Sequence, residues 1–186
     1  GGAAGQELAL LQKLDPSHRQ GGYELTFDGS VPVGDLKRGS NLYVRLLSSS
    51  LEESIEVRTK ERIKMGTSQH LVLNYDGSGK ASGVRLFLDG KPFALEVLKD
   101  RLSGSIQNSS PLEIGNKDIG NAYRGNLDDL RIYRRELSAA EIEQLSLHHP
   151  IRSLLSADSR KLNENQKKAR REKLKDYFLT YEIPEP

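Results

Sequence analysis

The sequence predicts an all-β protein, an antiparallel sandwich of two sheets followed by a helical extension. Two observations indicate the sandwich: short runs of alternating apolar and polar residues recur along the chain, and turns rich in Gly separate them. A third indicates the extension, because helix signals replace the alternation near residue 138. An apolar content of 35% suits strands that each bury one face.

The clearest strands lie in the central stretch, residues 69–91. Its alternating apolar residues are Leu71, Leu73, Tyr75, Val84, Leu86 and Leu88. The linking segment Asp76–Gly83 is rich in turn-forming residues, and Asp89-Gly90 predicts a tight hairpin because both residues of that turn need positive φ. A third strand is expected at Pro92–Val97, with Pro92 at the first position, where a missing N–H costs least.

Further strands and loops follow from the same patterns. Strands are expected at Leu8–Leu14, Tyr23–Phe27, Asn41–Leu47, Ser54–Thr59, Leu112–Ile114 and Leu127–Tyr133. Leu8–Leu14 also has high helix propensity, so its residues alone leave its secondary structure open. Loops are expected at Asp15–Gly22 and Asn116–Arg124, and Val31–Ser40 is either a loop or a broken edge strand.

Helix signals dominate the C-terminal part. Ser138 and Glu141 form a capping box, which predicts a short helix of about ten residues ended by Pro150. A second, charged helix is predicted at Asn163–Leu179, with Asn163 as its N-cap. Its thin apolar stripe consists of Leu162, Leu174 and Phe178.

Composition excludes several classes of protein. The chain has 186 residues and a net charge of +2, so no overall field attracts nucleic acid or acidic lipid. It has no Cys, which excludes disulfides and covalently attached haem, and no apolar run approaches the ~20 residues that span a bilayer. We therefore expect no nucleic-acid partner and no membrane insertion. The sequence begins without Met, so we expect it to be a piece of a longer protein.

Three motifs, in their order and spacing, carry a family resemblance. They are HLVLNYDGSG…GVRLFLDGKP, PLEIGN and GNLDDLRIYRRELSAAEIEQL, which begin at His70, Pro111 and Gly125. Together they resemble laminin-G-like, concanavalin-A-like lectin/glucanase jelly-roll domains. The most similar version belongs to large exported planctomycete proteins that also carry c-type cytochrome domains.

The resemblance implies a jelly-roll sandwich over residues 6–147 and a helical linker over 148–186. It also favours a strand at Leu8–Leu14 and an extracytoplasmic location, periplasmic or secreted. The sequence departs from the family in two ways. The family's Trp before the central strand is absent, with Ser68 nearest, and so is its usual opening strand. Either one sheet is a strand short or another segment, such as the tail, takes that place.

The candidate sites are weak. The resemblance admits calcium near Asp128 and Asp129, but we favour one Asp bonding backbone N–H groups and the other facing water. Adjacent residues on a strand point to opposite faces, so this pair cannot form a glycosidase dyad. The stretch Glu52–Glu56 is nearest to a glucanase motif and lacks its central Asp. No catalytic and no metal-binding residues are predicted, and the ligand-binding residues stay unknown.

Other motifs favour structural roles. The histidines His18, His70, His148 and His149 lack metal-ligand spacing. Gly77-Ser-Gly79-Lys80 joins two strands and is not followed by a helix, so it indicates a turn rather than a phosphate loop. In the charged helix, bases alternate with Glu164, Glu172 and Asp176, which favours a solvated face.

The sequence therefore predicts a non-catalytic recognition module that binds carbohydrate or another extracellular ligand within a larger exported protein. No cofactor is expected, with calcium the one alternative. A structural domain that holds neighbouring domains of the parent protein is the second hypothesis, and a glucanase-like hydrolase is the third. With no Trp in the chain, the aromatic residues that remain for sugar stacking are tyrosines, most of which we expect in the core or in cross-strand pairs. They are Tyr23, Tyr43, Tyr75, Tyr123 and Tyr133.

Overall fold

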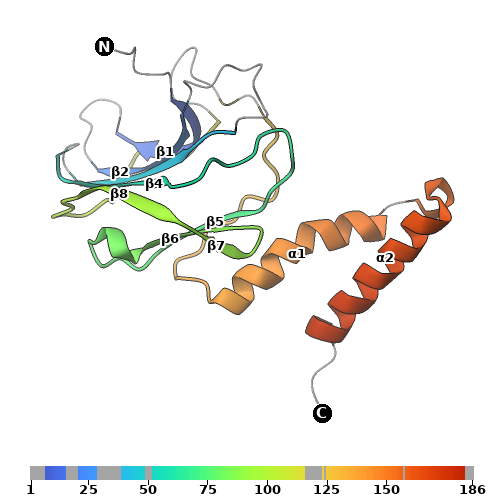
Figure 1. The fold of residues 1–186 in the computed structure, drawn as a ribbon. Helices are drawn as coiled ribbons and strands as arrows, with labels where there is room; N and C mark the ends of the chain where they lie inside the picture. The colour runs from blue at the N-terminus through green and yellow to red at the C-terminus, as the bar shows by residue number, and fades with distance from the viewer. Residues whose placement is uncertain are drawn as a thin grey trace. The chain divides into compact units, whose positions relative to one another are not determined.

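The computed structural model describes residues 7–15, 21–28, 39–48, 52–115, 123, 125–156 and 158–182. Over these ranges it confirms an antiparallel β-sandwich with C-terminal helices (Figure 1). A six-stranded sheet has the order β8-β4-β3-β2-β1-β9, and a three-stranded sheet has the order β5-β6-β7. The strands are β1 (Leu8–Leu14), β2 (Gly22–Phe27), β3 (Leu42–Leu47), β4 (Ser54–Thr59), β5 (Leu71–Tyr75), β6 (Val84–Leu88), β7 (Lys91–Phe93), β8 (Leu95–Asp100) and β9 (Glu113–Ile114).

The chain forms two compact units, and each is described by itself. Unit 1 consists of Gly1–Ser68, Leu73–Leu86 and Pro92–Glu136. Unit 2 consists of Gln69–Val72, Phe87–Lys91 and Leu137–Pro186. The boundary predicted at residue 147 stays a prediction.

Alternating apolar residues of the strands form the core of unit 1. The apolar residues predicted on one face of β3 are Leu42, Val44 and Leu46, and all three are buried. Val57 of β4 lies opposite Val44 and is fully buried too. From the second layer, Val84 and Leu86 of β6 are buried, and the Asp100 carboxylate accepts a 2.8 Å hydrogen bond from the Ala81 N–H. Both faces of this core therefore come from the predicted strands.

The central hairpin is confirmed. Asp89 has φ 50° and Gly90 has φ 79°, the two positive angles that the Asp-Gly signal requires. The Asp89 N–H donates to the His70 carbonyl at 2.8 Å, and the Asp89 carboxylate accepts from the His70 N–H at the same distance. Two hydrogen bonds therefore join the turn to the residue that precedes β5.

The strand predicted at Pro92–Val97 is two strands. β7 pairs with β6 in the smaller sheet, whereas β8 pairs with β4 in the larger one. The chain leaves one ladder at Ala94, whose carbonyl accepts from the Lys60 N–H at 2.9 Å. Periodicity alone cannot show such a break, because residues on both sides of it stay extended.

The strand predicted at Leu127–Tyr133 is wrong. Residues 126–133 form no strand, and residues 125–135 are all exposed. Asp129 has φ 53°, a left-handed conformation that interrupts an extended chain, and its N–H donates to the Asp128 carboxylate at 2.9 Å. Such local side-chain bonds compete with ladder formation. We call residues 126–133 the open segment below.

In unit 2, a helix packs against the end of the central hairpin. Helix α1 (Ala139–Ser156) buries Ile142 against Phe87 and Leu137. Its predicted capping box is confirmed, because the Ser138 N–H donates to Glu141 and the Glu141 N–H donates to the Ser138 hydroxyl. The predicted end at Pro150 is wrong, since α1 continues to Ser156. Proline removes one intrahelical hydrogen bond, which a helix of 18 residues tolerates.

The second helix, α2 (Glu164–Tyr177), begins as predicted, with Asn163 and Gln166 forming a capping box. It buries no residue, and the chain continues as a π-helical turn, Phe178–Glu182. The described tail is therefore helical and supplies no strand to either sheet. Within the described residues, neither helix has the length and apolar character needed to cross a bilayer.

Candidate functional site

One face of the six-stranded sheet carries polar residues in register across all six strands. The first row consists of Glu113, Gln12, Glu24, Arg45, Glu56 and Lys99. The second row consists of Thr26, Tyr43, Arg58 and Glu96. We call these two rows the polar face. On β2, β3 and β4 they occupy the positions that alternate with buried apolar residues, so one strand pattern builds both the core and this face there.

Arg45 is the centre of the polar face. Its Nη1 and Nη2 atoms donate to the two carboxylate oxygens of Glu7, both at 2.6 Å. Nη1 also donates to Glu24 at 2.8 Å, and Nε donates to Glu56 at 2.8 Å. Only 14% of the Arg45 side chain is exposed. One guanidinium therefore joins the carboxylates of β2 and β4 to the residue that precedes β1.

Burial acts to lower the pKa of Arg45, but the hydrogen bonds to Glu7 and then Glu24 outweigh it and raise the pKa above its ordinary value. The guanidinium therefore stays charged and holds its partners in place. Such a network is costly to break, because removing one member leaves poorly solvated charge behind.

Two cations lie close to the Tyr43 ring. The Arg45 Cζ atom is 5.4 Å from the centre of the Tyr43 ring, and the Arg58 Cζ atom is 5.9 Å from it. Arg58 also pairs with Glu96 on the neighbouring strand. Hydrogen bonds to Tyr43 and then to Glu96 raise the pKa of Arg58. The result is a half-buried aromatic ring framed by charged hydrogen-bonding groups.

Sequence reasoning missed this site. The signal was present, because Glu24, Arg45 and Glu56 stand at the polar positions of three predicted strands. Their contact depends on strand register, which a single sequence does not give. Among the predicted tyrosines, Tyr43 belongs to the polar face, whereas Tyr123 stacks on Phe27 with ring centroids 6.1 Å apart.

The structure does not bring the proposed glucanase-like carboxylates together. Glu52 is 78% exposed at its side chain and lies 3.7 Å from the Lys99 Nζ atom. Glu53 accepts from the Ser48 hydroxyl at 3.2 Å, while Glu56 is paired with Arg45. The three glutamates thus have three different surroundings.

Asp128 and Asp129 lie in the open segment. Asp128 accepts from the Asp129 N–H, and both oxygens of Asp129 accept from Arg131, from Nε and Nη2 at 2.9 Å each. Among the described residues, no group of three His, Asp or Glu side chains could hold a metal ion. His18 and the side chains of His148 and His149 lie outside the described residues.

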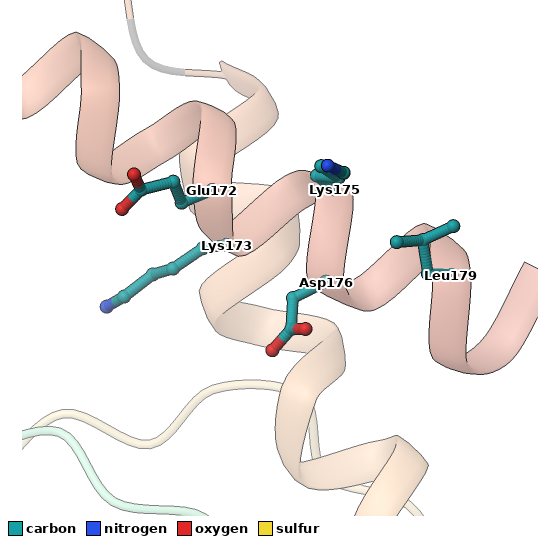
Figure 2. A pocket seen from close by; sticks show the side chains of 5 residues that line it. All are labelled: Glu172, Lys173, Lys175, Asp176 and Leu179. Atoms are coloured by element: carbon teal, nitrogen blue, oxygen red, sulfur yellow. The ribbon is translucent and has the colours of Figure 1, made fainter.

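Two further features are structural. Gly77–Lys80 forms the predicted turn between β5 and β6, where the Gly79 N–H donates to the Tyr75 hydroxyl at 2.7 Å. A hollow on α2 is lined by Glu172, Lys173, Lys175, Asp176 and Leu179 (Figure 2). These side chains point apart rather than toward a common centre, so this hollow is a weaker candidate than the polar face.

The crystal structure of an S-layer domain-containing protein from Clostridium thermocellum ATCC 27405, residues 221–444, is similar at 18% identity and a TM-score of 0.35. The likeness covers 78% of this chain and 65% of that one, so this chain spans less than two thirds of it. No curated protein matches the sequence.

A family model matches residues 9–143, which include both sheets and the polar face. Its description is the concanavalin A-like lectin/glucanases superfamily. The match covers well over half of the chain and agrees with the observed antiparallel sandwich. The chain belongs to the concanavalin A-like lectin/glucanases superfamily.

Proposed function

We propose that the chain is a non-catalytic recognition module that binds carbohydrate on the polar face. The observation that carries the proposal is the partly exposed Tyr43 ring with Arg45 and Arg58 close to it. Sugar hydroxyls both donate and accept hydrogen bonds, so they match paired guanidinium and carboxylate groups. An aromatic ring with an apolar face and a few well-placed polar groups is typical of small-ligand sites.

The rigidity of the face supports the proposal. Arg45 is fixed by three carboxylates, and Gln12 donates to Glu113 farther along the same row. Side chains that are already ordered lose little entropy when a ligand binds. Because Gln12, Glu24 and Thr26 are buried, the groups that a ligand can reach are the partly exposed ones, chiefly Tyr43, Arg58 and Glu96. The ordered residues beneath them hold this surface in place.

We further propose that the module works outside the cytoplasm as one domain of a larger exported protein. The resemblance to laminin-G-like domains of exported planctomycete proteins supports this setting. We propose that binding needs no cofactor, and a calcium comparison tests that point directly.

A glycan array probed with and without calcium tests the function. We expect binding to at least one glycan, equal in both conditions. Arg58→Gln should weaken it by about tenfold or more, because hydrogen bonds to a charged group are each worth about 1.5–3 kcal/mol. Arg85→Gln is the matched control, since Arg85 forms a similar half-exposed pair with Glu136 away from the polar face. Silence of the wild type in both conditions would contradict the proposal.

A structural interaction domain is the second candidate. The observation that favours it is the open segment, where Leu130 and Ile132 are 54% and 64% exposed. Apolar side chains that gather on a surface mark protein contacts more often than sugar sites. Binding of a neighbouring domain, together with a silent glycan array, would favour this candidate.

A glucanase-like hydrolase is the third candidate and has less support. Its carboxylates would need to face a common cleft about 5–10 Å apart. The carboxylate of Glu56 is instead paired with Arg45 at 2.8 Å. Release of reducing sugar from any glycan that binds would revive this candidate.

A further inference from the structure

We propose that the open segment, residues 126–133, is an interaction surface for a second copy of this chain, with which it pairs as an antiparallel strand centred on Leu130. The inference is independent of the proposed glycan binding, because it uses a different surface. It rests on three features of the segment: its exposure, its charge order and its backbone.

The open segment is apolar and exposed. Leu127 is 47% exposed, Leu130 54%, Ile132 64% and Tyr133 42%. Its residues alternate as in a strand, yet they form no strand within the described structure. An exposed, strand-like stretch of this kind is a template for pairing with another chain.

The charge order argues that the partner is a second copy. One face of an extended segment would present Leu127, Asp129, Arg131 and Tyr133, which is the order apolar, acidic, basic, apolar. Read in the opposite direction, the same four residues give apolar, basic, acidic, apolar. In an antiparallel pair centred on Leu130, each Asp129 lies opposite the other copy's Arg131, and each Leu127 lies opposite Tyr133.

The other face of the antiparallel pair has both a favourable and an unfavourable contact. Leu130 meets Leu130 of the second copy on the two-fold axis, whereas Asp128 lies opposite Ile132. The first pair is favourable and the second is not. We therefore expect a reversible dimer rather than a permanent one.

Within a single chain, Asp129 and Arg131 already form an ion pair. Asp129 bonds Arg131 at 2.9 Å through two contacts, with Asp129 in the left-handed region at φ 53°. That conformation has a modest cost, because Asp tolerates it better than most residues with a side chain. Extension of the segment removes this cost, and the bonds within one chain are replaced by equivalent bonds between two chains.

Sedimentation equilibrium of the full chain, up to about 1 mM, tests the dimer. Leu130→Lys should abolish association. Asp129→Arg and Arg131→Asp should each weaken it by about tenfold or more, since like charges then face each other, and the double charge swap should restore it. Leu98→Lys, at an exposed apolar residue on the edge strand β8, is the matched control and should leave the dimer intact.

Cysteine crosslinking tests the register, because the chain has no Cys of its own. Leu130→Cys should form a disulfide dimer under oxidised glutathione, since the two positions meet on the axis. Ile132→Cys alone should not, but it should crosslink when mixed with Asp128→Cys. A wild type that stays monomeric, a dimer that survives Leu130→Lys, or a charge swap that fails to restore association would overturn the inference.

Discussion

Single residues decide the character of the polar face. Arg45 holds Glu7, Glu24 and Glu56 within 2.8 Å of its nitrogens. Ion pairs on an open surface contribute little, but these side chains are mostly shielded from water. We therefore assign to Arg45 the positioning of these three carboxylates.

Replacement of Arg45 should therefore destabilise the protein. Arg45→Ala should lower the free energy of unfolding by about 3 kcal/mol at pH 7, because three ionised carboxylates then repel one another without a cation. Urea unfolding at pH 7 measures the loss.

Arg85→Ala is the control for that experiment. The Arg85 side chain is 54% exposed and pairs with Glu136, so its loss should cost less than about 1 kcal/mol. An Arg45→Ala protein that unfolds like the Arg85→Ala protein at pH 7 would contradict the role given to Arg45.

At the scale of elements, much of the fold follows from sequence. Alternation located β2 to β6, whereas the family resemblance favoured the strand at β1. The Asp89-Gly90 signal predicted the turn that the φ angles confirm. Capping residues gave the start of both helices. These features succeed because their causes are local: side-chain direction, backbone freedom and the first hydrogen bonds of a helix.

The features that the sequence did not predict have long-range causes. The break between β7 and β8 at Ala94 depends on which sheet each half joins, which is a long-range choice. The open segment has a strand pattern, but the pattern forms a strand only where a neighbouring ladder is available. The polar face was not predicted for the same reason. Arg45 contacts Glu24 and Glu56 only because strand pairing places these residues opposite one another.

The contact between the hairpin and α1 gives a prediction at this scale. Gly90 has φ 79°, and a Cβ atom there would lie 2.6 Å from the Ser146 hydroxyl of α1. Gly90→Ala should therefore cost the backbone penalty of about 1–2 kcal/mol and also displace α1. Hydrogen exchange of the α1 amides, together with urea unfolding, measures the displacement.

Gly77→Ala separates the two contributions. Gly77 has nearly the same φ, 77°, but nothing lies within 4 Å of its added Cβ atom. It should show the backbone penalty alone and leave α1 protected. Equal stability and equal α1 exchange in the two variants would mean that Gly90 does not contact the helix as described.

At the scale of the whole molecule, three sets of residues have three different tasks. The apolar positions of its strands form the core, the alternate positions form the polar face, and the open segment presents apolar residues to solvent. Family membership accounts for the first of these tasks. It does not determine the other two, because function resides in particular sites and not in the fold.

The most direct test of the account is NMR mapping of a bound glycan on the full chain. An oligosaccharide selected on the array is titrated into the labelled protein, and amide shifts are followed along both units. We predict the largest shifts at Tyr43, Arg58 and Glu96, with α2 unchanged. Shifts confined to α2 or to the open segment, or none at saturating oligosaccharide, would contradict the claim that the polar face binds carbohydrate.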